Sequence, residues 1–149
     1  MSYRVVSRNE EDTIVLAENI ESEKFPNMVI CLYGDLGSGK TLFVKGFANA
    51  LEIDENVTSP TFNIIKEYKG QMDLYHMDVY RCGSQVECLG LEEYFTKGGI
   101  VMIEWADLIE DELPKERLDV FFEVLENDTR VIRLKPYGDK YEDVCEAVI

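Results

Sequence analysis

Eight consecutive residues have the composition of a phosphate-binding loop. Residues Gly34 to Thr41 read Gly-Asp-Leu-Gly-Ser-Gly-Lys-Thr, which fits the pattern GxxxxGK[ST] at every fixed position. Glycines let a backbone curl so that its N–H groups face phosphate oxygens, and a helix that begins there adds the positive end of its dipole. In such a loop Lys40 reaches the β- and γ-phosphates, and the Thr41 hydroxyl ligates Mg²⁺. The motif therefore predicts binding of a nucleoside triphosphate, ATP, with Mg²⁺.

A site that hydrolyses nucleotides also needs carboxylates to hold the metal and place the attacking water. Glu104 follows the apolar run 100–103, as the acid at the end of a Walker B strand does; the alternative is an ordinary solvated strand end. Asp78 follows a second predicted strand, although a lone charge in that position is usually only solvated. We predict Thr41 and Glu104 as metal ligands, and Glu104, Asp78 and Lys40 as catalytic residues.

Three other residues are weaker candidates. Thr61 belongs to a loop at 58–61, after the predicted P-loop helix, where such proteins place residues that sense the γ-phosphate. Trp105 either packs in the core or offers an aromatic surface near the nucleotide or a partner. His76 is more simply a structural histidine than a catalyst. The residues predicted to bind nucleotide are Asp35, Leu36, Gly37, Ser38, Gly39, Lys40, Thr41, Leu42, Thr61 and Trp105.

Hydrophobic periodicity predicts the elements on either side of the loop. The run 28–33 is apolar without polar alternation, as in a strand that is buried on both faces of a parallel sheet. After Lys40, residues Phe43, Phe47 and Leu51 recur at helical spacing. A strand, a glycine-rich turn and a helix thus follow one another, and this is the context that the phosphate-loop motif requires.

The remaining pattern completes an α/β chain. A capping box from Ser7 to Glu10 predicts a helix over about residues 8–22, and Tyr141–Val148 is predicted as a short terminal helix. Further helical segments are expected at 84–95 and 106–112, and strands at 62–68, 72–77, 100–103, 118–125 and 130–134. We predict one domain over residues 1–149 with the three-layer P-loop NTPase fold, a mostly parallel central sheet with antiparallel additions.

Composition favours a cytoplasmic protein without a membrane span or a signal peptide. The 149 residues include 30 acids against 15 bases spread along the sequence, a formal net charge of −15. Such a chain repels a nucleic-acid backbone, so we expect it to bind neither DNA nor RNA by itself. Four cysteines without a CxxC pair and a single histidine argue against a zinc site or a disulfide framework.

In combination, these motifs resemble the TsaE family, formerly called YjeE. The resemblance rests on four motifs in this order: 34–41, Thr-Ser-Pro-Thr-Phe at 58–62, His-Met-Asp-Val-Tyr-Arg at 76–81, and Ile-Glu-Trp at 103–105. It covers about residues 8–135, and the segment after Pro136 carries no family motif. The third motif more often reads HFDLYRL in the family, so Met77, Val79 and Cys82 are conservative or peripheral departures.

The resemblance implies a bacterial ATPase required for the threonylcarbamoyl modification of adenosine 37 in tRNAs that read ANN codons. Members of the family bind the TsaB–TsaD pair, in which TsaD carries out the transfer, and ATP hydrolysis is thought to reset that complex between turnovers. Thr41 and Glu104 would then serve the metal, Asp78 the metal or the water, and Thr61 the switch. ATPase activity of the isolated chain would be feeble, and tRNA would be held by the partners.

Three other functions are compatible with the phosphate loop. A small-molecule P-loop kinase needs a substrate pocket and usually an arginine-bearing lid, whereas Arg117, Arg130 and Arg133 lie in or beside predicted strands. A GTPase is disfavoured because no NKxD motif occurs in the sequence. A binding module that uses the nucleotide only as a structural ligand or switch would share the loop, and turnover measurements would separate it from an ATPase.

Overall fold

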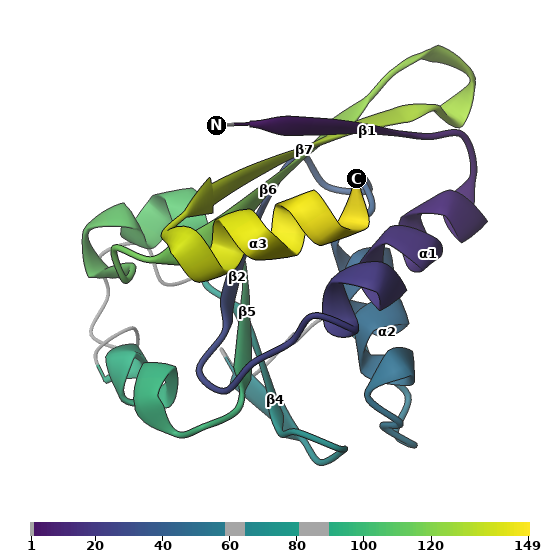
Figure 1. The fold of residues 1–149 in the computed structure, drawn as a ribbon. Helices are drawn as coiled ribbons and strands as arrows, with labels where there is room; N and C mark the ends of the chain where they lie inside the picture. Colours follow the sequence, from purple (N-terminus) through teal and green to yellow (C-terminus); the bar gives the residue numbers. More distant parts are fainter. Residues whose placement is uncertain (1, 59–64, 81–89) are drawn as a thin grey trace.

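Seven strands form one sheet in the order β1-β7-β6-β2-β5-β4-β3 (Figure 1). The computed structural model describes residues 2–58, 65–80 and 90–149. Four central strands run parallel: β6 (Arg117–Val124), β2 (Val29–Tyr33), β5 (Ile100–Glu104) and β4 (Leu74–Asp78). Antiparallel strands extend both edges: β7 (Arg130–Tyr137), β1 (Tyr3–Ser7) and β3 (Ile65–Tyr68). The predicted α/β fold, with a parallel centre and antiparallel additions, is confirmed.

The described α-helices all lie on one face of the sheet (Figure 1). They are α1 (Glu10–Glu21), α2 (Lys40–Ala50) and α3 (Asp139–Val148). The apolar faces of these helices and the sheet form the larger core cluster, whose members include Ile20, Phe43 and Phe47. Helices α1 and α2 approach closely at Gly46, where a Cβ atom would lie 3.2 Å from the Ile14 Cα. None of the helices in the described ranges is long and apolar enough to cross a membrane.

Shorter 3₁₀ segments pack against the other face over β2, β5 and β4. They are η2 (Leu91–Thr96) and η3 (Ala106–Glu112), and a third such segment, η4 (Glu126–Asp128), joins β6 to β7. A second apolar cluster forms there and includes Cys31, Met77 and Ile103. Cys31 therefore packs as a small hydrophobe, and burial raises the pKa of its thiol.

Helix α1 begins later than the capping box predicted. Its N-cap is Asn9, whose side chain accepts a hydrogen bond from the Asp12 N–H at 2.8 Å, while Asp12 accepts one from the Arg8 N–H at 2.9 Å. Ser7 instead ends β1, where it pairs with Arg130, and its hydroxyl lies 2.7 Å from that of Thr13. The predicted cap was wrong because Ser7 is still paired in β1, and the chain enters the helix two residues later, at Asn9.

Several other boundaries differ from the sequence-based predictions. Strand β1 was not predicted, and β7 continues through Pro136 to Tyr137, so that α3 begins at Asp139. Segment 106–112 is a 3₁₀ helix interrupted at Ile109, and the helix predicted over 84–95 is 3₁₀ from Leu91. The predicted residues 62–64 and 84–89 lie outside the described ranges.

Candidate functional site

The parallel strands bring the predicted acids and the phosphate loop to one edge of the sheet. Asp78 and Glu104 are the last residues of β4 and β5 and are register partners, and Glu104 also pairs with Leu32 of β2. Side chains alternate between the two faces of a strand, so Asp78, His76 and Glu104 share the face that α2 covers. The loop after β2 therefore meets the carboxylates in three dimensions, as the sequence predicted.

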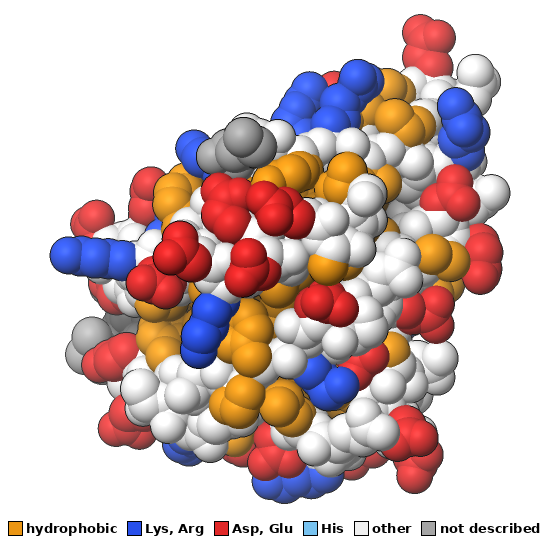
Figure 2. Space-filling model, in the orientation of Figure 1, with side chains coloured by type: hydrophobic (Ala, Val, Ile, Leu, Met, Phe, Trp, Pro, Cys, Tyr) orange, Lys and Arg blue, Asp and Glu red, His pale blue; other side chains and the backbone are white. Residues whose placement is uncertain are grey.

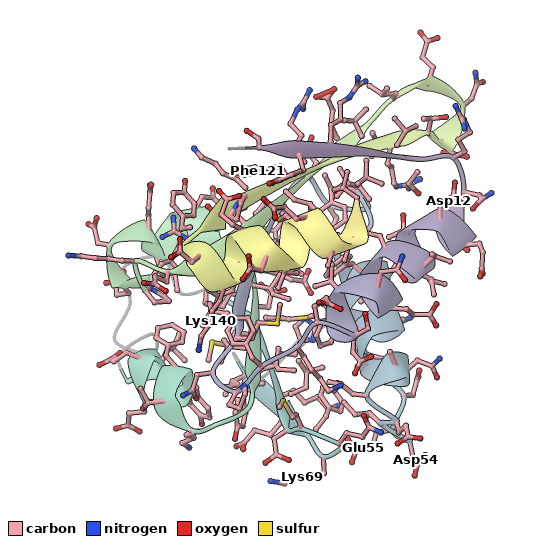
Figure 3. All side chains as sticks on the ribbon, in the orientation of Figure 1. Asp12, Asp54, Glu55, Lys69, Phe121 and Lys140 are labelled. Atoms are coloured by element: carbon pink, nitrogen blue, oxygen red, sulfur yellow. The ribbon has the colours of Figure 1, made fainter. Side chains whose placement is uncertain are left out.

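A cleft of about 330 Å³ lies at this edge. Nine of the predicted site residues line it: Leu36, Gly37, Gly39, Lys40, Thr41, Leu42, Asp78, Glu104 and Trp105. Asp35 and Ser38 instead line a larger cavity of about 610 Å³ against Phe121 and Phe122 of β6. Figure 3 labels Phe121 near the β1–β7 edge. The predicted Thr61 lies outside the described residues.

Backbone constraints explain the glycines of the loop. At Gly34 a Cβ atom would lie 2.6 Å from the Ser38 Oγ and 2.9 Å from the Phe122 carbonyl oxygen, so no larger residue fits without a shift. Gly39, the N-cap of α2, has a φ of 113° and offers no side-chain cap to the first turn. The free N–H groups at the start of α2 are therefore available to an anion.

Lys40 is held by two uncharged groups. Its side-chain ammonium donates to the Gly34 carbonyl oxygen at 2.6 Å and lies 3.4 Å from the centroid of the Trp105 ring. Only 4% of the residue is exposed, and burial lowers the pKa of the ammonium, against the opposing field of Glu104 and Asp78. A phosphate would offer this buried cation a far stronger partner than a carbonyl and a ring face.

Trp105 owes its place to an unusual backbone conformation. It directly follows Glu104 and adopts φ 63° and ψ 35°, a left-handed conformation that costs about 1–3 kcal/mol in a non-glycine residue. Its ring lies against Lys40 and 4.9 Å from the ring of Tyr80. The indole is only partly buried and faces the cleft, which favours the aromatic-surface alternative over simple core packing.

Glu104 is a buried carboxylate with partners on two sides. Its Oε2 lies 2.6 Å from the Nε2 of His76, and both residues are almost fully buried. The Thr41 hydroxyl faces the two carboxylate oxygens at 3.5 and 3.4 Å, which is long for a hydrogen bond. The strand end predicted from sequence is therefore not solvated, and His76 contacts the site rather than lying elsewhere in the core.

Asp78 lies beside this group. Its Oδ1 accepts a hydrogen bond from the Tyr80 N–H at 3.0 Å, and the Val79 N–H donates to the Glu104 carbonyl oxygen at 3.2 Å. These bonds fix the turn after β4 against the end of β5. The Asp78 side chain is partly exposed and lines the cleft with Glu104.

The donor set fits Mg²⁺ in the presence of a nucleotide. Mg²⁺ prefers oxygen ligands, and in nucleotide sites it is held by one or two carboxylates together with phosphate oxygens. Here one hydroxyl and two carboxylates converge next to the start of α2, from Thr41, Glu104 and Asp78. These are the residues that would hold the ion.

Two residues that line the cleft were not predicted as site residues. Glu10 comes from the first turn of α1, and Arg130 from the first position of β7. The guanidinium of Arg130 donates to the carbonyl oxygens of Ser38 at 2.9 Å and Gly37 at 3.4 Å. No local motif marks either residue as part of the site, because each reaches the site through pairing of the distant strands β1 and β7.

His76 provides a stability prediction, since it supplies the closest partner of the buried carboxylate. We expect His76→Leu to lower the free energy of unfolding by about 1.5–3 kcal/mol, because Glu104 loses a hydrogen bond at full burial. Urea denaturation would measure the loss. In a Glu104→Met background the same substitution should cost much less, so an equal loss in both backgrounds would contradict the coupling.

The chain is similar to known proteins of one family. Residues 7–132 match the family model described as "Threonylcarbamoyl adenosine biosynthesis protein TsaE". A tRNA threonylcarbamoyladenosine biosynthesis protein TsaE from Bacillus subtilis is 48% identical over 147 residues, covering 98% of this chain and 92% of the relative. A protein of the same name from Treponema pallidum is 38% identical over 131 residues, 87% of this chain and 97% of the relative.

A solved structure supports the same relationship. The crystal structure of YdiB from Bacillus subtilis superimposes with a TM-score of 0.89 at 42% sequence identity. The match covers 99% of this chain and 94% of that one. With the family model spanning all the motifs of the site, the chain belongs to the TsaE family.

Proposed function

We propose that this protein binds Mg-ATP in the cleft at the end of β2 and hydrolyses it. The observation that carries the proposal is the convergence of Lys40, Thr41 and Glu104 behind a complete phosphate-loop sequence. The loop amides and the start of α2 would bind the phosphates, and Lys40 would leave the Gly34 carbonyl for the β- and γ-phosphates. Asp78, Glu104 and Lys40 remain the proposed catalytic residues.

The two carboxylates would bind the metal ion and orient the attacking water. Mg²⁺, when bound, would neutralise charge that develops on the phosphates during transfer. Glu104, oriented by His76, would hold the ion with Thr41, and the more exposed Asp78 would hold the ion or orient the attacking water. Trp105 and the loop residues around it would enclose the nucleotide. The isolated chain is expected to turn over slowly, because the cleft is open to solvent on the side of Leu36, which is 91% exposed.

We also propose that this ATPase serves the formation of threonylcarbamoyladenosine in tRNA, in the cytoplasm, together with the TsaB–TsaD pair. Membership in the TsaE family and the names of its relatives support this role. The acidity of the chain supports a division of labour in which the partners hold the tRNA. Figure 2 shows a field of acidic side chains over α3, where Asp139, Glu142, Asp143 and Glu146 are found.

The phosphate-loop lysine provides a prediction about nucleotide binding. Replacing Lys40 with Ala removes a charge-assisted contact to phosphate, so the affinity for Mg-ATP should fall roughly tenfold to a hundredfold. Isothermal titration calorimetry would measure this change. Lys45→Ala, an exposed lysine on the same helix, serves as the control and should bind like the wild type. Unchanged affinity in Lys40→Ala would overturn the assignment of the loop.

A second prediction separates binding from hydrolysis. Glu104→Gln and Asp78→Asn keep the side-chain shapes but remove the charges, so both variants should fold normally and lose ATP hydrolysis measured with the partners present. Asp54→Asn is the control, since Asp54 is exposed and lies beyond the far end of α2 from the loop (Figure 3). If either variant keeps full turnover and normal stability, the residue replaced in that variant is not catalytic.

The third prediction tests the cellular role in two experiments. Gel shift with unmodified tRNA at physiological salt should show no tight complex for the isolated chain, and tight binding would contradict the argument from charge. Multiple-turnover modification by the TsaB–TsaD pair should stall without this protein and resume when it is added, but not with Lys40→Ala. Full modification in its absence would refute the proposed role.

A further inference from the structure

Arg130 connects the β6–β7 hairpin to the phosphate loop. It is the first residue of β7 and is fixed on both sides by the sheet, with Val124 of β6 and Ser7 of β1 as its register partners. Its Nε donates to the Ser38 carbonyl oxygen at 2.9 Å, and one terminal nitrogen donates to the Gly37 carbonyl oxygen at 3.4 Å. The other terminal nitrogen donates to the Asp128 carbonyl oxygen at 2.8 Å.

We infer that Arg130 is a positioning residue that holds the phosphate loop in its nucleotide-binding conformation before the nucleotide arrives. The inference rests on the proposed function of the same cleft. In a planar trans peptide, the carbonyl and the following N–H point in opposite directions. By binding the Ser38 carbonyl, Arg130 turns the Gly39 N–H away from the guanidinium. That amide belongs to Gly39, the N-cap residue of α2, at the anion-binding end of the helix.

The conformation of the loop makes such a support necessary. Gly37 and Gly39 adopt φ values of 80° and 113°, and glycine has many other conformations open to it in a free loop. An unsupported loop would lose that freedom on binding and thereby weaken the affinity. Arginine is suited to the task because its planar fork spans two acceptors at once, whereas a lysine presents a single ammonium.

The turn of the β6–β7 hairpin holds this side chain beside the loop. Asn127 and Asp128 both have a φ of 60°, and the turn is closed by a 2.7 Å hydrogen bond from the Leu125 N–H to the Thr129 carbonyl oxygen. Asn and Asp are the non-glycine residues that adopt this conformation most readily, and two of them in succession suit the tight turn of a β-hairpin. The bond from Arg130 to the Asp128 carbonyl links this turn to the guanidinium, so hydrogen bonds of one side chain connect the hairpin to the loop.

The test compares three variants with the wild type: Arg130→Gln, Arg130→Lys and Arg133→Gln. Arg133 lies two residues further along β7 and is half exposed, with Glu123 at 3.5 Å as its ion partner, so it is the matched control. Affinity for Mg-ATP and for Mg-ADP is measured by calorimetry, and KM and kcat by steady-state hydrolysis. Hydrogen exchange of the peptide covering residues 34–41 is followed in the nucleotide-free proteins.

We expect Arg130→Gln to bind both nucleotides roughly tenfold to a hundredfold more weakly, with KM raised to match and kcat changed less than about threefold. Arg130→Lys keeps the charge, but its three donors share one nitrogen and do not reproduce the planar fork that reaches three carbonyl oxygens, so its loss of affinity should be intermediate. The 34–41 amides should exchange faster in Arg130→Gln, while Arg133→Gln matches the wild type in every measurement.

Wild-type affinity and wild-type exchange in a folded Arg130→Gln would overturn the inference, as would a loss confined to kcat. If Arg130→Gln does not fold, the test rests on Arg130→Lys. Wild-type nucleotide affinity and wild-type hydrogen exchange in Arg130→Lys would then refute the role of the planar fork. Failure of the wild type to bind Mg-ATP refutes the proposed function instead, and the hydrogen-exchange comparison remains interpretable in that case because it needs no nucleotide.

Discussion

Glu104 carries a carboxylate with 3% exposure at the end of a central strand, and a charge so far from water requires partners. His76 supplies one at 2.6 Å, and the Thr41 hydroxyl lies on the other side. Replacing the partners with apolar groups would leave the charge unsatisfied, so the sequence around this acid is tightly constrained. The same requirement makes the site receptive to a cation, because a carboxylate buried against a hydroxyl is a partial coordination shell.

The direction of the strands and the alternation of side chains along them place these groups. Parallel alignment of β2, β5 and β4 gives them a common carboxyl edge, and the alternation of side chains puts His76, Asp78 and Glu104 on the face of α2. A one-residue slip of β4 against β5 would turn His76 to the opposite face, where the second apolar cluster lies. The buried contact between His76 and Glu104 and the apolar faces therefore specify the same register.

Much of this arrangement could be predicted from sequence because its signals are local. The phosphate loop, the buried strand before it and the acid after the apolar run 100–103 each occupy a few consecutive residues. The short edge strand β1 could not be predicted, since its partner β7 lies more than a hundred residues away in the chain. Arg130 was missed for the same reason, and the motif alone does not tell that Asp35 and Ser38 line the second cavity.

The distribution of acids explains how a chain with a net charge of −15 can still offer a site for a polyanion. The first turns of α1 and α3 carry acids, as expected for helix N-termini, but the first turn of α2 carries none. Salt screens exposed charges that lie more than about 8 Å apart at physiological ionic strength, so exposed acids beyond that distance contribute little at the loop. Phosphates bound at the loop would lie near the α2 amides and Lys40, while a bound Mg²⁺ would offset the carboxylates that also line the cleft, Glu10, Asp78 and Glu104. At the same ionic strength the acidic surface repels a nucleic-acid backbone only where the two approach closely, which is consistent with the proposal that the partners hold the tRNA.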